Sequence, residues 1–394
     1  MSEGGRVVLI GATGFTGART LREIAALNLP VLLLGRNVER LQSAAVECSA
    51  DVRVTRCDLS EPGSLDGLIS SDDVVVSTVG PFVTLGASVA EAASSAGAAY
   101  LDSTGEPAFI RALYNDSDQV ATNGAVLIPA FGYDYLPGVA AAANLLRRHE
   151  SARSVKVGYF LTDVVGGIIP VRKIRSATTP ATRESLIRAI GEPSHVFRRS
   201  SDEFGVVAEP SGRRLMRFYI DPGRTARAIS VGGSEHFSLP EVFPNLDAVD
   251  VGLGWLGGMS IPANLLSRTV LSSRYLGNGV RRFANMIAPV VAFKDSYPTE
   301  GVRSMIVVEC RGGDGRILDR ATWRGTEPYT FTARMLAWGA QSLLRRRPEP
   351  GVHGALRAFG TERLSEAVRC AGIEECATND GGRPMLPTTR IHTI

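Results

Sequence analysis

The feature that most constrains this chain is a turn spaced by glycines, between an apolar run and a helix-forming run. Val7 to Ile10 are all aliphatic, and residues 18–27 are mostly Ala, Arg and Leu. A continuous apolar run is typical of a strand buried on both faces, whereas Ala, Arg and Leu favour a helix. The amino-terminal segment therefore predicts a buried strand, a tight turn and a helix.

The turn carries Gly11, Gly14 and Gly17, with the spacing Gly-x-x-Gly-x-x-Gly. Gly11 allows a turn without a Cβ penalty, while Gly14 and Gly17 allow close approach of a diphosphate and tight packing of helix on strand. Amides at a helix start bind anions. The alternative is a strand, turn and helix whose small residues serve packing alone. The residues expected to bind a dinucleotide here are Gly11, Thr13, Gly14, Phe15, Thr16 and Gly17.

A second apolar run over 31–34 ends at Gly35, Arg36 and Asn37. In a Rossmann fold the end of the second strand contacts the adenosine ribose, where an acidic residue bonds the 2′-hydroxyl of NAD. Arg36 instead offers a planar cation that suits a 2′-phosphate. This position therefore predicts NADP(H) over NAD(H).

The first third of the chain alternates strand and helix patterns. This alternation predicts an α/β fold with a doubly wound parallel sheet and right-handed crossovers. The expected strands are 7–10, 31–34, 52–57, 73–77, 99–102 and 125–129, and the expected helices are 15–27, 38–48, 65–69, 85–96 and 107–123.

Ligands bind at the carboxyl ends of the strands in such a sheet, so the residues that follow each strand are site candidates. Asp58 is placed to accept from the adenine amino group, or else serves as a turn and cap residue. Residues 102–106 form either a helix cap or a polar cluster on the side of the substrate or of the nicotinamide. Thr78, Val79, Gly80 and Pro81 follow the fourth strand, where the nicotinamide half is expected; a plain Gly-Pro turn is the alternative.

Two phenols and a carboxylate follow the sixth strand and precede an Ala-rich helix expected over 139–148. This location makes Tyr133, Asp134 and Tyr135 the catalytic candidates, with a tyrosine as proton donor and Asp134 as its partner. A phenol titrates far from neutral pH, so such a donor needs a neighbouring cation or a relay. The alternative is structural: Asp134 caps the helix and the tyrosines pack at the domain junction.

Beyond residue 150 the pattern predicts an α+β domain with a mostly antiparallel sheet. Residues 154–162 alternate in polarity, and hairpin turns separate later strands. His236 is either an acid or base near neutral pH or a structural histidine on a strand edge. The expected strands are 154–162, 215–220, 225–231, 247–253, 305–311 and 316–323, and a helix begins within 175–185.

Taken in order, several motifs resemble the saccharopine dehydrogenase-like oxidoreductases, a group that includes the bacterial trans-acting enoyl reductases. The matching segments are 11–17, 35–36, 77–82, 100–106 and 132–137, and the segment 327–340 resembles the closing helix of the family. The resemblance implies an NADP-binding Rossmann domain over 1–135 and an α+β substrate domain over 136–328. Carboxyl-terminal helices over 329–394 are expected to return to the Rossmann lobe. The glycine-rich turn of the family is missing within 175–185.

The resemblance further implies hydride transfer involving a C=C, C=N or C=O bond of a small or carrier-bound metabolite. The alternative is a non-enzymatic regulator that senses NADP. No tyrosine has a lysine four residues later, as short-chain dehydrogenases require, and there is no Gly-x-Ser-x-Gly motif. The scattered histidines give no metal site.

The composition gives no support for a nucleic-acid-binding or a membrane-spanning protein. A net charge of +3 over 394 residues gives no reason to expect nucleic acid as a partner. The most apolar stretch, 286–293, is too short to span a bilayer, and residues 385–394 suggest an extended tail. The five cysteines form no Cys-x-x-Cys pair, so we expect free thiols and a cytoplasmic location, with a homodimer as a candidate assembly.

Overall fold

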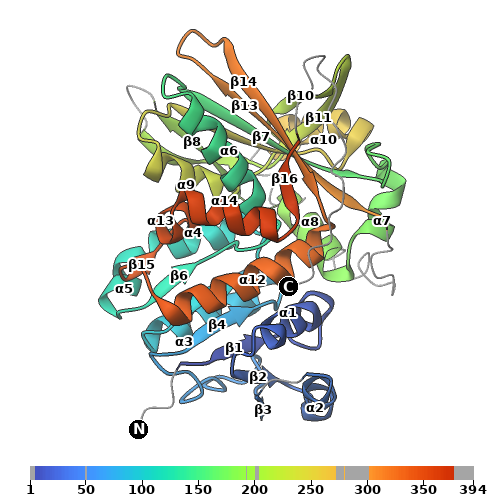
Figure 1. Ribbon diagram of the computed structural model, residues 1–394. Helices are drawn as coiled ribbons and strands as arrows, with labels where there is room; N and C mark the ends of the chain where they lie inside the picture. The colour runs from blue at the N-terminus through green and yellow to red at the C-terminus, as the bar shows by residue number, and fades with distance from the viewer. Residues whose placement is uncertain are drawn as a thin grey trace.

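The computed structural model describes residues 5–48, 51–191, 193–199, 204–271, 279 and 301–376. Two sheets organise this part of the chain, one in the lower half of Figure 1 and one in the upper half. The segments 286–293 and 385–394 lie outside the described residues.

The first sheet is parallel throughout, in the order β15-β6-β5-β4-β1-β2-β3. Every residue of β1 and β4 is buried, which is why the sequence is apolar throughout β1 and over the first three residues of β4. The predicted Rossmann sheet is confirmed. Its strands are β1 Val7–Ile10, β2 Val31–Gly35, β3 Val52–Arg56, β4 Val74–Ser77, β5 Ala99–Asp102, β6 Val126–Ile128 and β15 Gly351–Val352.

Helices cover both faces of this sheet. Val7 and Leu9 belong to the core cluster beneath α1 and α12, whereas Val8 and Ile10 belong to the opposite cluster, beneath α3 and α4. Successive strand residues point to opposite faces, so both faces are buried. The elements are α1 Phe15–Ala26, α2 Val38–Val46, η1 Phe82–Gly86, α3 Ala87–Ser95, α4 Pro107–Asn115, α5 Ser117–Thr122 and α12 Pro328–Arg345.

Two expected helices in this lobe were wrong. Residues 65–69 form turns, because Gly67 adopts a φ of 69° that does not continue a helix. The helix expected over 107–123 is divided at Asp116 into α4 and α5. Asn115, Asp116 and Ser117 lie at the break, and side chains of these types compete with helical hydrogen bonds.

The second sheet runs in the order β10-β11-β12-β7-β13-β14-β16, and β8 pairs with both β12 and β9. β7 and β12 are parallel, and the other described pairs are antiparallel. The predicted mostly antiparallel sheet is therefore confirmed, although β8, β9 and β16 were not expected. The strands are β7 Ser154–Thr162, β8 Pro193–Arg199, β9 Phe204–Pro210, β10 Leu215–Asp221, β11 Arg224–Ser230, β12 Ala248–Leu253, β13 Arg303–Arg311, β14 Ile317–Gly325 and β16 Ile373–Glu375.

The Ala-rich α6 packs on β7, β13 and β14 and is buried along most of its length. His236 does not lie on a strand edge as expected, but in α9, which begins after Ser234 with Glu235 in its first turn. The helical elements of this lobe are α6 Leu136–Arg148, η2 Val171–Lys173, α7 Ile174–Ala177, α8 Pro180–Gly191, α9 Glu235–Val242, η3 Gly257–Met259, α10 Ser260–Leu266, η4 Ser267–Leu271, α13 Ala355–Phe359 and α14 Thr361–Cys370.

The carboxyl-terminal part of the chain contributes to both sheets. Helix α12 lies against α1, β4 and β5, and β15 joins the first sheet beside β6. Helix α14 then packs on α6, and β16 joins the second sheet beside β14 (Figure 1). The chain therefore passes between the lobes more than once, and the boundaries at residues 135 and 328 stay a prediction.

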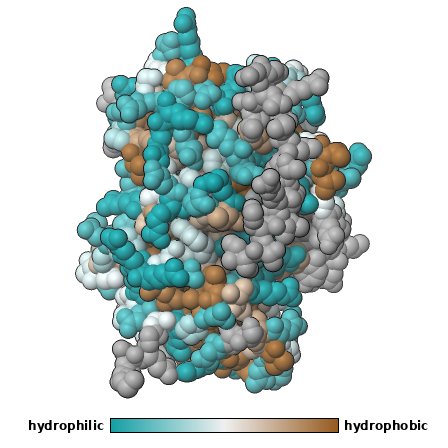
Figure 2. Space-filling model, in the orientation of Figure 1, coloured by the Kyte–Doolittle hydropathy of each residue, from teal (hydrophilic) through white to brown (hydrophobic). Residues whose placement is uncertain are grey.

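The face seen in Figure 2 is largely hydrophilic, with small and separate hydrophobic patches. None of the described helices combines the length and the apolar character that a membrane crossing requires. All five cysteines have free thiols.

Candidate functional site

The glycine turn between β1 and α1 makes contacts that only glycine allows. Gly11 has a φ of 96°, in the left-handed region. A Cβ on Gly17 would overlap the carbonyl group of Gly11. No side chain caps α1 at Gly14, so amides of its first turn are left for a ligand. This close-packed turn at an uncapped helix start fits the diphosphate of a dinucleotide.

The loop after β4 is tied directly to this turn. The amide and hydroxyl groups of Thr78 both donate to the carbonyl oxygen of Ile10, at 3.0 and 3.2 Å. The Thr78 side chain also fills the space beside Gly11 and Gly17. Thr78 therefore fixes the start of the loop that carries Val79, Gly80 and Pro81.

Glu106 holds the other end of this loop. Its buried carboxylate accepts hydrogen bonds from the amides of Phe82 and Val83, at 3.0 and 2.9 Å. Ser185 of α8 donates to the same carboxylate at 3.0 Å. Glu106 thus links the loop after β4 to a helix of the second lobe, instead of capping α4 with its side chain.

Two arginines flank the place expected for the adenosine ribose. Arg36 is exposed at the end of β2, and the guanidinium of Arg40 lies 3.5 Å from the carbonyl oxygen of Thr13 in the glycine turn. The pKa of Asp58 is lowered, chiefly by its hydrogen bonds from Ser60 and also by the charge of Arg36. Asp58 therefore has the geometry of a turn residue, and its contact with adenine stays a prediction.

A cavity of about 390 Å³ lies between the carboxyl ends of the first sheet and the second lobe. Most of its lining is apolar, and none of the described lining residues is Lys, Arg or His. The described residues also include no group of three or more His, Cys, Asp or Glu that could hold a metal ion. The lining includes Thr16, Thr78, Gly80, Tyr133, Asp134, Tyr135, Tyr159, Leu161, Leu186, Ile229, Trp255 and Leu266.

Asp134 is the one carboxylate among the described lining residues. None of the described residues donates a hydrogen bond to its side chain, and its Oδ2 lies beside Gly105, where a Cβ would be 2.9 Å away. Burial raises the pKa of Asp134 to about 6. A carboxyl group in this state exchanges a proton near neutral pH, which is what a general acid requires.

The phenols of Tyr133 and Tyr135 are engaged in hydrogen bonds to the backbone. Tyr133 donates to the carbonyl oxygen of Phe160 at 3.3 Å, and Tyr135 donates to that of Gly105 at 3.1 Å. Burial raises the pKa of both phenols far above the ordinary value. Both residues line the cavity, but their phenolic protons are donated to the backbone carbonyl oxygens of Phe160 and Gly105. Their role as proton donors stays a prediction.

Comparison with known proteins identifies the first lobe. Residues 7–128 match the family model described as the saccharopine dehydrogenase NADP binding domain. This part of the chain resembles a saccharopine dehydrogenase NADP-binding domain. The predicted family resemblance and the predicted cofactor, NADP, are thereby confirmed, and the glycine turn and Arg36 lie within the matched residues.

The chain also matches curated proteins over part of its length. The chain is 35% identical over 150 residues to the trans-acting enoyl reductase of Mycobacterium tuberculosis (strain ATCC 25618 / H37Rv) and 33% identical to that of Mycobacterium ulcerans (strain Agy99). Each match covers 36% of this chain and 35% of the relative, so the matched region spans about a third of these proteins.

A solved structure resembles nearly the whole chain in fold. Apo saccharopine dehydrogenase (L-Glu forming) from Saccharomyces cerevisiae superposes with a TM-score of 0.55 at 13% identity, covering 94% of this chain and 99% of that one. The second lobe therefore shares the architecture of this neighbour.

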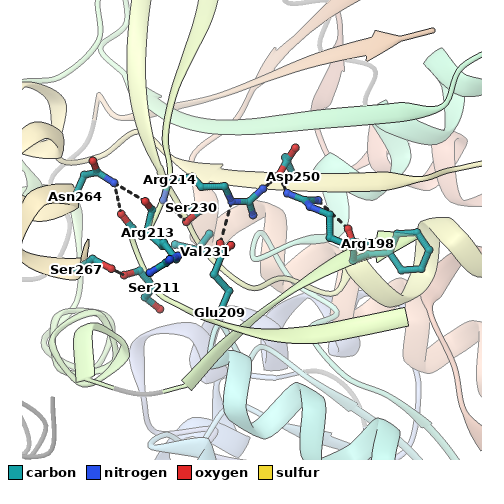
Figure 3. Close-up of polar contacts among 12 residues, drawn as sticks. Arg198, Glu209, Ser211, Arg213, Arg214, Ser230, Val231, Asp250, Asn264 and Ser267 are labelled. Atoms are coloured by element: carbon teal, nitrogen blue, oxygen red, sulfur yellow. Dashed lines mark hydrogen bonds and ion pairs between the residues drawn. The ribbon is translucent and has the colours of Figure 1, made fainter. Parts of the chain in front are cut away.

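The wall of the cavity opposite the NADP-binding domain is braced by polar contacts (Figure 3). Asn264 of α10 donates to two carbonyl oxygens of the turn 211–213, at 2.7 and 2.8 Å, and Ser267 donates to a third at 2.6 Å. Arg214, which follows the turn, pairs with Asp250 of β12. The turn that lines the cavity is thus fixed to both α10 and the second sheet.

Several residues of the site were not predicted from the sequence. They include Arg40 beside the glycine turn, Ser185 on α8, and the buried pair Tyr159 and Glu235 beneath Tyr135. Their partners lie far away in the chain, so no local pattern marks them. The one available signal is Gly138 and Gly233, glycines at places where a Cβ would collide with this pair.

Proposed function

We propose that this protein is an NADPH-dependent reductase that adds hydrogen across a polarised double bond of an apolar substrate. The observation that carries the proposal is the titratable carboxyl group of Asp134, the one carboxyl group among the described residues that line the apolar cavity. The same cavity reaches Thr16 and Thr78 of the NADP-binding domain. Because relatives that match about a third of this chain are named trans-acting enoyl reductases, the C=C bond of an enoyl thioester, free or carrier-bound, is the first substrate to test.

In the proposed reaction the hydride, the proton and the positioning of the substrate come from different groups. NADPH, when bound, supplies the hydride for one end of the double bond. Asp134 in its acid form gives a proton to the other end and is left as a carboxylate, which takes a new proton from water. The apolar walls position the substrate and limit access of bulk water. Hydride and proton together account for the two hydrogens gained.

The lining also limits the charge of the substrate. A substrate carboxylate in this cavity would face Asp134 and would meet no cationic side chain among the described lining residues. Burying an unpaired charge is costly. The cavity therefore favours an uncharged acyl or alkyl chain and disfavours an amino-acid or dicarboxylate substrate.

The test is NADPH oxidation with pairs of enoyl thioesters, imines and ketones that differ only in a terminal methyl or carboxylate group. We expect kcat/KM to be at least about tenfold higher for the methyl member of a turned-over pair. With deuterium at C4 of the nicotinamide, the reduced product should gain one deuterium on carbon. Tight NADPH binding without turnover of any member would instead support the NADP-sensing alternative.

A further inference from the structure

The phenol of Tyr159 makes short contacts with two acceptor oxygens, although it has only one proton to donate. Its Oη lies 2.6 Å from the carbonyl oxygen of Tyr135 and 2.6 Å from Oε1 of Glu235, and it accepts a hydrogen bond from the amide of Gly138 at 3.1 Å. A phenol donates a single proton. The carbonyl oxygen can only accept, so it takes the proton of Tyr159. The contact with Glu235 then needs a proton on Glu235.

The surroundings of Glu235 support the same assignment. Its side chain is fully buried, and no described residue donates a hydrogen bond to Oε2. An ionised carboxylate at this buried position would lack hydrogen-bond donors to offset its lost hydration, whereas a neutral carboxylic acid costs little free energy to bury. Burial accordingly raises the pKa of Glu235 to about 8, with the nearby Asp134 as a further raising influence.

The other titratable groups around Glu235 do not compensate a charge on it. Tyr159 of β7 faces Oε1, and Tyr135 and Asp134 precede α6. His236 follows Glu235 on α9, and its pKa is lowered well below the ordinary value by burial. His195 of β8 contacts the carbonyl oxygen of Gly233, and burial lowers its pKa to about 4. Both histidines are therefore neutral near pH 7.

Two glycines make room for this arrangement. A Cβ on Gly138 would collide with Tyr159 Oη, and a Cβ on Gly233 would collide with Glu235 Oε2. Tyr159 also acts at the start of α6, where Tyr135 occupies the cap position without a side-chain cap. The hydroxyl of Tyr159 therefore binds the backbone on both sides of the first turn of α6.

We propose that Glu235 is held as a neutral carboxylic acid and, through Tyr159, fixes the backbone that presents Asp134 to the cavity. Glu235 is then a positioning residue: it is not among the described residues that line the cavity, and it acts through Tyr159, which is. Asp134 has no side-chain partner of its own among the described residues, so its orientation depends on its neighbours. The inference rests on the proposed function only for its kinetic consequences.

The kinetic test compares Glu235→Gln with Glu235→Ala and Tyr159→Phe. In Glu235→Gln the glutamine amide donates to Tyr159 as the neutral acid does, so we expect kcat close to the wild-type value. Because glutamine does not ionise, this variant should not lose activity at alkaline pH through ionisation of residue 235. The other two variants release the backbone at Asp134, and we expect kcat to fall about 100-fold with little change in KM. If kcat falls equally in Glu235→Gln and Glu235→Ala, the inference is overturned.

A second measurement needs no substrate. The infrared difference spectrum of wild-type protein minus Glu235→Gln should contain the carbonyl band of a protonated carboxylic acid at pH 7, and the band should disappear as the pH rises through about 8. Asp134→Asn is the matched control and should keep the band. A wild-type spectrum without the band contradicts the inference even if the protein proves to be a reductase, and a band in a protein without reductase activity supports it.

Discussion

The hydroxyl group of Ser185 donates a hydrogen bond to Oε1 of Glu106 across the boundary between the two lobes, at 3.0 Å. The same carboxylate accepts from the amides of Phe82 and Val83 in the loop after β4. One buried side chain therefore couples α8, which lines the cavity, to the loop expected to contact the nicotinamide.

Replacing Glu106 with Gln should uncouple these segments, because an amide offers only one acceptor oxygen and leaves a buried backbone amide unpaired. We expect a loss of about 1.5 to 3 kcal/mol in the free energy of unfolding, the usual effect of removing a hydrogen bond to a charged group. We also expect the Glu106→Gln variant to bind NADPH more weakly than the wild type does. Urea unfolding and an NADPH titration measure both quantities. Glu91→Gln, on the exposed side of α3, is the control and should change neither.

Arg36→Ala should reduce the preference for the phosphorylated cofactor. If Arg36 binds the 2′-phosphate, losing this charge-assisted contact should weaken NADPH binding about 10-fold to 100-fold. Binding of NADH, which lacks that phosphate, should not change and serves as the internal control. Fluorescence titrations of both cofactors give the result. Equal weakening of both would show that Arg36 acts on the fold instead.

Much of the NADP-binding domain could be predicted because its signals are local. The apolar runs of β1 and β4, the glycines of the turn and Arg36 at the end of β2 are each defined by neighbours in the sequence. Helix breaks were harder to predict. Each break occurs at one residue, Gly67 in the first case and Asp116 in the second. The apolar pattern of the sequence does not reveal the backbone conformation of either residue.

The second lobe and the buried support of the site depend on contacts between distant residues. Tyr159 and Glu235 are 76 positions apart, and Ser185 and Glu106 are 79 apart. Tyr133 and Tyr135 line the cavity, but the sequence could not show that backbone carbonyls accept from their phenols. The raised pKa of Asp134 likewise arises from burial, which only the assembled fold creates.

The double variant Tyr133→Phe, Tyr135→Phe separates the two roles considered for these phenols. If the phenols only hold the backbone, the free energy of unfolding should fall by about 1 kcal/mol per lost hydrogen bond, and the pH dependence of the remaining activity should keep its shape. Urea unfolding and a pH profile of kcat measure both. A lost or displaced ionisation in the profile, with stability unchanged, would make a tyrosine the proton donor.

The most direct test of the account is Asp134→Asn, followed by NADPH oxidation against pH with an apolar enoyl thioester. The folded pKa of Asp134 is raised to about 6, so the acid form that donates the proton predominates below that pH, and the wild-type rate should fall as the pH rises through it. The variant should bind NADPH normally, lose about 10²-fold to 10⁴-fold in kcat, and show no such fall. A variant that keeps the wild-type rate and the same pH dependence would contradict the role of Asp134 as the proton donor.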